Sequence, residues 1–447
     1  MTKWKRILGV GMAAMMTFSL AACGNSSESE ENTEAQSEQS GPVSLEGKKI
    51  TFMTCQGKFF EEYNTMAEAI EEDYGCEIEF QVVPDSEYST LLKVKLSTSE
   101  VPDVFEYNFP TQNAEIGAAE YCEDLSNEEW VSRLVNPELI KDPDDGKIYA
   151  LPKESSSGYM AVYYNKEVLA DCGIEDPHPK TYDEFVEILD TVKEKGNGVT
   201  PLLVTNKDNW TTQIFMTCGF PVILGDKAEE TFQKILNNEL KWTDVPEFQE
   251  VVQDYLDLID AGYVNEDYLS AGYDMAAERI GEGEAAMYVI NEPWAIDMAS
   301  KYPDCELGAF VIPYGDNDVM ATGAYVQGLF VPKSGAQTDV AKEFLKVWSD
   351  PKYQNLYYES LPGSSAFNDV DGGDMLGCIQ YLVDNYITTG NYTYQINDQM
   401  AECSTIWTEL WNFYIKASAG DKTPEEVFDS FQLIYEDYMM QQGAEGF

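Results

Sequence analysis

The sequence predicts an α/β fold in which strands alternate with helices that cover a mainly parallel sheet. Residues 49–54, 78–82 and 104–105 have the pattern of strands, and the segments between them carry apolar residues at helical spacing. A second alternation begins near Tyr159, with a strand over 160–164 and helices after it. Repeated alternation of strand and helix is typical of a parallel sheet wrapped by helices.

The first alternation is defined by apolar periodicity. In the strand over 78–82, apolar residues alternate with polar ones, which predicts one buried and one wetter face. A helix follows the first strand and another follows the second. Their predicted buried stripes are Tyr63, Met66, Ala67 and Ile70 in one helix, and Tyr88, Leu91, Leu92 and Leu96 in the other.

Later helices show both start signals and buried stripes. Thr181 with Glu184, and Thr423 with Glu426 after Pro424, are typical helix starts. A further strand is predicted over 202–205. The predicted stripes are Phe185, Ile188, Leu189 and Val192; Phe248, Val251, Val252, Tyr255 and Ile259; Val340, Phe344, Leu345 and Trp348; and Val427, Phe431, Ile434 and Tyr438.

The N-terminus has the features of a secretion signal that ends at a cysteine. A basic head precedes an apolar stretch over residues 7–20, which Ala21, Ala22 and Cys23 follow. The stretch is too short to remain as a membrane-spanning helix, and small residues stand where a peptidase cuts. This run resembles a bacterial lipobox, which implies removal of the signal peptide 1–22 and acylation of Cys23 by chains such as palmitate.

The segment after Cys23 is rich in Ser, Glu, Gln and Asn and nearly free of large apolar residues. Such a composition cannot bury enough surface to fold, so residues 23–45 are expected to be a lipidated cysteine and a flexible tether. Beyond Cys23 no apolar run approaches the ~20 residues that span a bilayer. We therefore expect a body on the extracytoplasmic face of the cell membrane, attached through its lipid anchor only.

The charge of the chain restricts its partners. Its 80 acidic and 28 basic side chains give a formal net charge of −52, which repels phosphate backbones and anionic lipids. Nucleic acid binding is therefore excluded, and a neutral ligand is favoured. A single histidine, His178, excludes histidine-based triads and multi-histidine zinc sites. The chain has no P-loop, so a partner must handle ATP. No cofactor is expected. Asp142, Asp144 and Asp145 do not have the spacing of an EF-hand, so no metal site is expected there, although the sequence leaves a bound calcium ion open.

The cysteines leave two interpretations open. Eight cysteines follow Cys23 at long and uneven spacings, and none forms a C-x-x-C pair. An exported protein can pair some of them in disulfides, and buried free thiols are equally compatible with the pattern.

Seven short segments occur in an order that resembles a known family. They are Val101–Phe105, Gly146–Pro152, Val162–Leu169, Pro179–Phe185, Gly283–Met287, Asn291–Trp294 and Ala341–Leu345. Each segment alone is a weak signal, but together they resemble the extracellular solute-binding proteins of ABC sugar importers, in the group typified by maltose-binding protein. The resemblance covers nearly everything after the tether, and the lipobox agrees with it.

The resemblance implies a two-lobed fold of the periplasmic-binding-protein type, with hinge strands and a ligand cleft between the lobes. Lobe 1 is expected to hold residues 46–151 and 326–362, and lobe 2 residues 152–325 and 363–440. The implied protein is no enzyme. It is expected to be a monomer that binds a neutral carbohydrate in the size range of oligosaccharides, closes around it, and delivers it to the membrane subunits of an ABC importer.

The resemblance also implies which residues contact the ligand. A sugar requires flat aromatic platforms and fixed polar groups, and 13% of the residues are Phe, Trp or Tyr. The expected platforms are Trp294, Trp407, Trp210 and Tyr107. The other expected contacts are Gln56, Lys58, Glu106, Asn108, Asp208, Asn209, Tyr159, Glu292 and Tyr325. Gln56 stands where the family offers an acid, which is a departure from the family pattern.

Two other functions remain open from the sequence. A sugar-sensing partner of a signalling receptor would need the same binding chemistry. An extracellular glycoside-acting enzyme would need two carboxylates at a defined separation, and with 80 acidic residues some pair always meets that condition.

Overall fold

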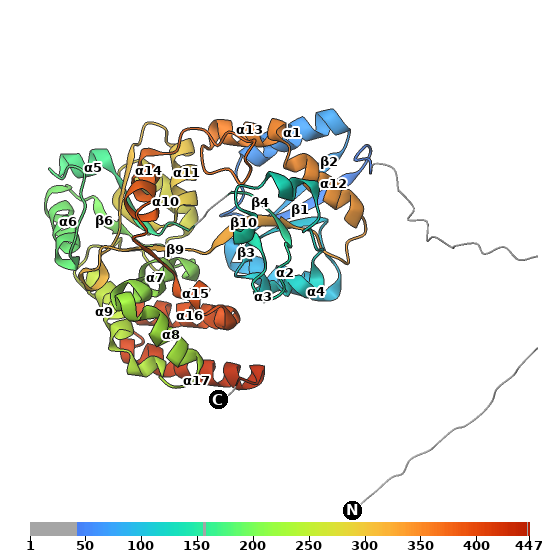
Figure 1. Ribbon diagram of the computed structural model, residues 1–447. Coiled ribbons are helices and arrows are strands. Elements are labelled where there is room, and N and C mark those ends of the chain that lie inside the picture. Colours follow the sequence, from blue (N-terminus) through green and yellow to red (C-terminus); the bar gives the residue numbers. More distant parts are fainter. Residues whose placement is uncertain (1–42, 155–157, 445) are drawn as a thin grey trace, which may run out of the picture. The chain divides into compact units, whose positions relative to one another are not determined.

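A computed structural model describes residues 43–154, 158–444 and 446–447 (Figure 1). The predicted signal peptide, Cys23 and most of the predicted tether lie outside the described residues. The end of the predicted tether is described, and Leu45 is buried in the folded body with 1% of its surface exposed. None of the helices in the described part of the chain combines the length and the apolar character needed to cross a bilayer.

The first sheet combines N-terminal strands with one strand from much later in the chain. Its order is β2 (Glu77–Val83), β1 (Lys49–Cys55), β3 (Val104–Pro110), β10 (Tyr325–Phe330) and β4 (Ala150–Pro152). Strand β1 runs parallel to β2 and to β3, as the sequence predicts. Strand β10 is antiparallel to both β3 and β4, so it joins distant parts of the chain.

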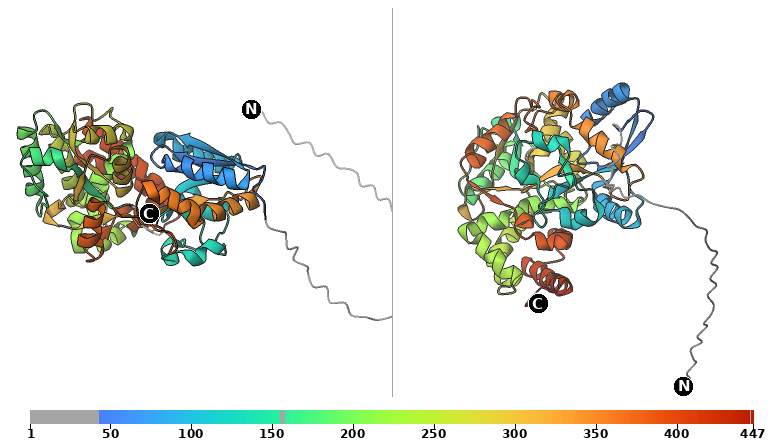
Figure 2. Two further views of the ribbon diagram at one scale, coloured as in Figure 1. Left: turned by 90° about the horizontal axis from the view of Figure 1, so that it is seen from above. Right: turned by 45° about the vertical axis from the view of Figure 1, so that its right-hand side comes forward.

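Helices cover this sheet and complete a first hydrophobic core, which we define as the buried residues within 45–151, 326–331 and 340–370. The buried face of α1 is the predicted stripe from Tyr63 to Ile70, and α1 packs against α12 and α13 (Figure 2). The helices of this part are α1 (Glu62–Tyr74), α2 (Asp85–Thr98), α3 (Asn113–Ile116), α4 (Ala118–Tyr121), η1 (Glu129–Arg133), η2 (Pro137–Ile140), α12 (Thr338–Trp348) and α13 (Pro351–Ser360).

The second sheet is mainly antiparallel, which differs from the predicted parallel arrangement. Its order is β6 (Thr200–Leu203), β7 (Ala285–Ile290), β5 (Ala161–Asn165) and β8 (Leu307–Phe310). Only β6 and β7 are parallel neighbours in it, and β5 is antiparallel to β7 and β8. A separate pair is formed by β9 (Met320–Thr322) and β11 (Tyr392–Tyr394). Apolar periodicity identifies strands but carries no information on their relative direction.

A second hydrophobic core surrounds this sheet, and we define it as the buried residues within 159–321 and 378–439. Two of its helices begin at predicted caps, since Thr181 and Thr423 each accept a hydrogen bond from the backbone three residues later. Its helices are α5 (Lys166–Asp171), α6 (Tyr182–Lys195), η3 (Asn209–Thr211), α7 (Thr212–Leu224), η4 (Gly225–Lys227), α8 (Ala228–Leu236), η5 (Trp242–Asp244), α9 (Pro246–Asp260), η6 (Tyr273–Met275), α10 (Ala276–Gly281), α11 (Glu292–Lys301), η7 (Tyr314–Asp316), α14 (Gly377–Leu382), η8 (Val383–Ile387), α15 (Ile396–Gln399), η9 (Ala401–Ile406), α16 (Trp407–Ser418) and α17 (Pro424–Gln442).

The chain passes between the two cores in segments that pair with one another. We call the described residues of 153–160 the first crossing, 321–325 the second crossing and 361–376 the third crossing; the buried residues of the third crossing up to Val370 still belong to the first core. The amide of Met160 donates to the carbonyl of Ala321 at 3.0 Å, and the amide of Gly323 donates to the carbonyl of Gly158 at 3.0 Å. A β-bridge also joins Glu154 to Ser365. Bending at one crossing therefore has to involve the others.

Glycine at position 158 is required by this pairing. Its φ is +96°, and a Cβ atom there would lie 2.9 Å from the backbone nitrogen of Gly323. Residues with side chains rarely adopt this φ, and the backbones approach too closely to admit one.

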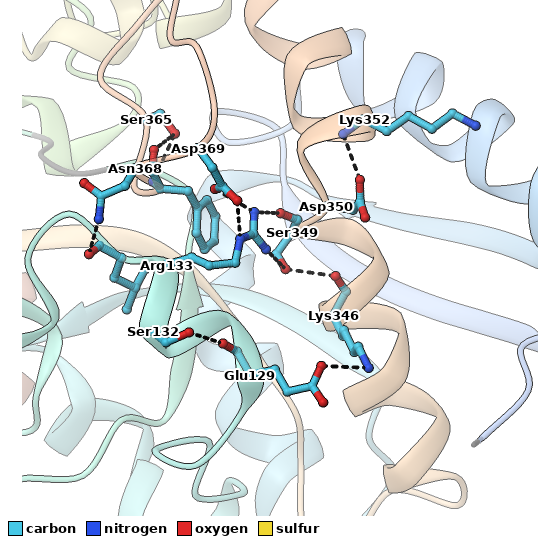
Figure 3. A network of polar contacts seen from close by, with 12 residues as sticks. Glu129, Ser132, Arg133, Lys346, Ser349, Asp350, Lys352, Ser365, Asn368 and Asp369 are labelled. Atoms are coloured by element: carbon cyan, nitrogen blue, oxygen red, sulfur yellow. Dashed lines mark hydrogen bonds and ion pairs between the residues drawn. The ribbon is translucent and has the colours of Figure 1, made fainter. Parts of the chain in front are cut away.

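The third crossing is anchored to the first core through Arg133, at the end of η1 (Figure 3). The guanidinium donates to both carboxylate oxygens of Asp369, at 2.8 and 3.0 Å, and to the carbonyl of Ser349 at 2.7 Å. It also lies 4.8 Å from the ring centre of Phe367. A forked guanidinium that bonds a carboxylate at two points restricts its orientation, so this end of the crossing is held in place.

All eight cysteines after Cys23 are free thiols in the structure. Burial raises the pKa of every one of them, and only Cys76 and Cys305 are partly exposed. We expect an aromatic disulfide reagent to react slowly with those two thiols in the native protein and with all eight after unfolding. If the unfolded protein had six or fewer reactive thiols in place of eight, disulfides would have formed.

Candidate functional site

A cavity lies between the two cores and encloses about 1350 Å³ of space, part of it open to solvent. We call it the cleft cavity. One wall comes from the first core, at the carboxyl ends of β1 and β3 and along α2. The opposite wall comes from the second core, mainly η3, η6, η9 and α16. Tyr325 and Gln327 of β10 lie where the two walls meet.

The first-core wall is lined by charged and hydrogen-bonding side chains. They include Lys58, Asp85, Ser89, Lys93, Tyr107, Asn108, Gln112 and Glu115. The two lysines and two carboxylates make this wall nearly balanced in charge, although the whole chain carries −52. Polar groups of both signs and both hydrogen-bonding types are therefore concentrated on one side of the cavity.

Hydrogen bonds fix the orientation of several of these groups. The hydroxyl of Tyr107 donates to Oε2 of Glu115 at 2.7 Å and lies 3.2 Å from Oγ of Ser89. The ammonium of Lys58 donates to Oδ1 of Asn108. Burial raises the pKa of Glu115, while the bond from Tyr107 and the charge of Lys93 act in the opposite direction. Preorganised donors and acceptors of this kind suit a ligand with several hydroxyl groups.

The second-core wall is aromatic, and the described side chains that line it carry no formal charge. Trp407 and Trp411 stand one helical turn apart on α16, and Trp210 of η3 packs near Tyr273 of η6 with ring centres 5.2 Å apart. Trp210, Tyr273 and Trp411 are partly exposed, whereas Trp407 is only 2% exposed and stacks on Phe431. The ring faces available to a ligand are therefore those of Trp210, Tyr273 and Trp411.

The cleft cavity brings together some of the sequence-predicted site residues. Trp407, Trp210, Tyr107, Lys58, Asn108 and Tyr325 line it. Gln56 is exposed next to the lining residues but does not line the cavity. Trp407 offers little surface to a ligand, because it is only 2% exposed and stacks on Phe431.

Three predicted contacts lie behind the cavity walls. Oδ2 of Asp208 accepts a hydrogen bond from the amide of Tyr273 at 2.8 Å, and Nδ2 of Asn209 donates to Oδ1 of Asn412 on α16 at 2.8 Å. These residues thereby hold the aromatic wall without lining it. Glu106 is fully buried in the first core, where Thr54 donates to its Oε2 at 2.7 Å.

Trp294 lies in the second core and does not line the cleft cavity. Only 1% of its surface is exposed, and its ring centre lies 5.1 Å from that of Tyr288 and 6.2 Å from that of Tyr163. Its neighbours Asn291 and Pro293 do line the cavity. The motif thus identifies a segment that reaches the site, but not the side chain that the sequence selected.

A second, smaller cavity lies among the crossings, and we call it the hinge cavity. It spans about 580 Å³ of space, part of it open to solvent, and is lined by Phe60, Lys153, Glu154, Tyr159 and Glu292, together with residues of α13, α14 and the third crossing. Tyr159 and Glu292 were predicted as ligand contacts and lie here instead. Pro293 and Gln327 line both cavities and separate them.

The sequence did not single out several residues of the site. Trp411 had a detectable signal, because a residue four positions after Trp407 shares its helix face. Tyr273, Lys93 and Glu115 had no such local signal, since tertiary packing alone places them beside the other residues. Across the described residues, no cluster of three or more His, Cys, Asp or Glu side chains is arranged to hold a metal ion.

Comparison with known proteins identifies the family. Residues 58–355 match the family described as bacterial extracellular solute-binding protein. The melibiose/raffinose/stachyose-binding protein MelE of Bacillus subtilis is 23% identical over 293 residues, which span 64% of this chain and 66% of MelE. The multiple sugar-binding protein of Streptococcus mutans is 23% identical over 370 residues, which span 80% of this chain and 81% of that protein.

Solved structures confirm the predicted two-lobed α/β fold. A sugar transporter of Bacillus licheniformis, solved in complex with stachyose, superposes with a TM-score of 0.69 at 20% identity over 87% of this chain and 100% of that one. RafE, solved in complex with raffinose, superposes with a TM-score of 0.70 at 18% identity over 87% of this chain and 99% of that one. The family inferred from the seven segments is confirmed as well: the chain belongs to the bacterial extracellular solute-binding proteins.

Proposed function

We propose that this protein captures an uncharged carbohydrate, of two or more rings, in the cleft cavity. The observation that carries the proposal is the contrast between the two walls. Partly exposed aromatic rings of Trp210, Tyr273 and Trp411 face a wall of hydrogen-bonding groups across one cavity. A sugar ring has one weakly apolar face and a rim of hydroxyls, which fits between two such walls.

The energetics are compatible with useful affinity. An aromatic face that hides about 100 Å² of apolar surface contributes on the order of 2.5 kcal/mol. Three such faces approach the ~8 kcal/mol of a micromolar complex, before the entropic cost of binding is subtracted. The balanced charges on the first-core wall supply hydrogen bonds without a net attraction for ions. An uncharged, hydroxyl-rich ligand is therefore favoured over an anion or a cation.

The relatives support the same class of ligand. MelE is named for melibiose, raffinose and stachyose, and the Bacillus licheniformis and RafE structures hold stachyose and raffinose. At 18–23% identity these likenesses do not transfer a particular sugar, so the linkage must be found by experiment.

We further propose that the two cores correspond to two lobes that close around the ligand by bending at the crossings. The expected lobe divisions near 151 and 325 fall beside the first two crossings. The buried residues Ala366, Phe367 and Val370 still belong to the first core, so we propose that the third division lies after 370 and not near 362. Delivery to an ABC importer, monomeric state and attachment through acylated Cys23 are proposed from the family and the lipobox. Cys23→Ser should release the protein from membranes into the medium, which fractionation of producing cells would measure.

A ligand screen tests the central proposal. We expect at least one of raffinose, stachyose, xylo-oligosaccharides or chito-oligosaccharides to raise the denaturation midpoint and to change tryptophan fluorescence at millimolar concentration. Prolonged incubation with the bound sugar should yield no hydrolysis product. A flat response across a broad carbohydrate panel would contradict the proposal, and product formation would favour an enzyme instead.

Trp411 provides a mutational test of the aromatic wall. We expect Trp411→Ala to raise the Kd for the bound sugar by roughly thirtyfold to seventyfold, since one platform of about 100 Å² is lost. Trp411→Phe keeps an aromatic face and should cost less. Titration calorimetry measures both, and the denaturation midpoint without sugar serves as the control. An unchanged Kd in Trp411→Ala would exclude this ring from the binding surface.

A further inference from the structure

Glu292 is the first residue of α11, and it stands between two residues of the ligand site. Asn291 and Pro293 line the cleft cavity, whereas Glu292 turns into the hinge cavity. Oε2 of its carboxyl group accepts hydrogen bonds from the amides of Gly158, at 2.7 Å, and Tyr159. One side chain thereby joins the start of α11, which bears part of the ligand site, to the first crossing.

The other carboxyl oxygen of Glu292 is buried and finds no hydrogen-bond partner among the described residues. The residue as a whole is 5% exposed. Burying an ionised oxygen without a donor is far more costly than burying a neutral carboxyl group. Burial therefore favours the protonated form of Glu292, while the backbone amides that donate to its carboxyl group act in the opposite direction and leave its pKa raised on balance.

The charges around the hinge cavity add to this preference. Glu154 lines the same cavity, and its negative charge disfavours a second one at Glu292. Lys153 is the only lysine that lines the cavity among the described residues, but its ammonium already donates to Gln327 and pairs with Glu106. The acidic groups here thus exceed the positive charge available to them.

Several other titratable side chains near Glu292 stay uncharged around neutral pH. Burial raises their pKa values, which keeps them uncharged: Tyr163 of β5, Tyr325 of β10, Tyr357 and Tyr358 of α13, and Cys378 of α14. Asp398 of α15 lies beyond Tyr325, where Thr111 and the amide of Ala324 donate to it. Glu154 and Glu292 are the two carboxyl groups that line the hinge cavity among the described residues, and burial raises the pKa of both.

We propose that Glu292 is a positioning residue of the ligand site: it takes up a proton when the crossings are held as in this structure, and so couples ligand affinity to pH. This inference rests on the proposed function, because it concerns the same site. A proton bound preferentially by the ligand-holding arrangement must, by linkage, strengthen ligand binding as pH falls. We expect affinity to increase from about pH 8 toward pH 6.

The direction of the stability change follows from the same groups. Burial raises the pKa of Glu292 to about 8 and that of Glu154 to about 7. Between the ordinary pKa of a glutamic acid and these values, the folded protein binds more protons than the unfolded chain. Stability is therefore expected to fall as pH rises from about 5 to about 8, and then to level off.

The test uses the full chain with stachyose, or with whichever sugar of the screen binds. We expect the Kd of the wild type to rise severalfold between about pH 6.5 and pH 8.5, since uptake of one proton changes affinity at most tenfold per pH unit. Calorimetry in two buffers with different ionisation enthalpies should show net proton uptake on binding. In Glu292→Gln, which keeps the shape of the side chain but cannot titrate, the change of the Kd over the same range should be clearly smaller than in the wild type, and only the part due to Glu154 should remain.

Asp254→Asn is the matched control. Burial raises the pKa of Asp254 to about 7 as well, but this residue lies on α9, away from both cavities. The variant should keep the wild-type pH dependence of the Kd. The inference is overturned if the wild type takes up no proton on binding, or if Glu292→Gln keeps the wild-type slope.

Two further measurements separate the possible failures. If no sugar binds, the proposed function has failed. The role of Glu292 can still be tested by measuring how the denaturation midpoint changes with pH. An equal change with pH in the wild type and in Glu292→Gln overturns the inference. If Glu292→Gln does not fold, the inference is tested with Glu154→Gln. This variant should still take up a proton on binding and should keep a pH-dependent Kd, and loss of both would contradict the role of Glu292. A wild type without proton uptake again contradicts the role of Glu292.

Discussion

Trp294→Ala is expected to lower the free energy of unfolding by about 3–5 kcal/mol, the usual range for removing a buried tryptophan from a core. The indole is 1% exposed and packs against Tyr163 and Tyr288 in the second core. Its Nε1 atom has no hydrogen-bond acceptor among the described residues, so the loss comes from packing. The surrounding rings cannot collapse fully into the space that the indole leaves.

The same substitution should have little effect on ligand affinity in protein that remains folded. We expect the Kd of Trp294→Ala, measured well below its denaturation midpoint, to stay within about threefold of the wild type. Trp411→Ala is the matched comparison, because it removes an equal side chain that is partly exposed in the cleft cavity. Trp411→Ala should lose affinity for the sugar and keep the wild-type free energy of unfolding. The opposite result, a stable Trp294→Ala that no longer binds, would place Trp294 against the ligand.

The segment from Asn291 to Trp294 shows why the sequence predicted the site only in part. Successive residues of a helix point about 100° apart, so neighbours at its start face different surroundings. Here Asn291 and Pro293 line the cleft cavity, Glu292 lines the hinge cavity and Trp294 enters the core. A motif can identify which segment reaches a site, but the rotation of the helix about its axis depends on tertiary packing.

The sequence-predicted residues at strand ends lie together in the structure. Lys58 follows β1, and Tyr107 and Asn108 belong to β3, which is the parallel neighbour of β1. All three line the cleft cavity. Parallel strands bring their carboxyl ends to one edge of a sheet, so the order of elements alone is enough to gather these side chains.

Helix stripes show a similar division between what periodicity predicts and what packing decides. In α1 all four predicted residues are buried. In α2 the prediction for Leu91 is wrong, because Tyr88, Leu92 and Leu96 form the buried row and Leu91 is 37% exposed. In α17 the buried face continues through Tyr435 and Met439, one position beyond the predicted Ile434 and Tyr438. The helix packs against α16 and α9 together, which moves its buried face around the axis.

Lys153→Met is expected to lower the free energy of unfolding by about 3–5 kcal/mol, because it leaves the carboxyl group of Glu106 buried without its positive partner. Nζ of Lys153 lies 3.6 Å from Oε1 of Glu106, and their side chains are 7% and 0% exposed. The ammonium also lies 4.2 Å from the ring centre of Phe60. Methionine preserves most of the stem, so the loss reports on the charge more than on packing.

A second substitution distinguishes the charge from the shape of this site. Glu106→Gln removes the negative charge and can still accept the hydrogen bond from Thr54. The double variant Glu106→Gln/Lys153→Met should therefore recover part of the stability that Lys153→Met loses, which denaturant unfolding measures. Additive losses would show that the two residues do not act as a pair. Lys153 stands at the first crossing, beside both Gln327 and the carbonyl of Lys58, so this ion pair lies next to the wall of the ligand site.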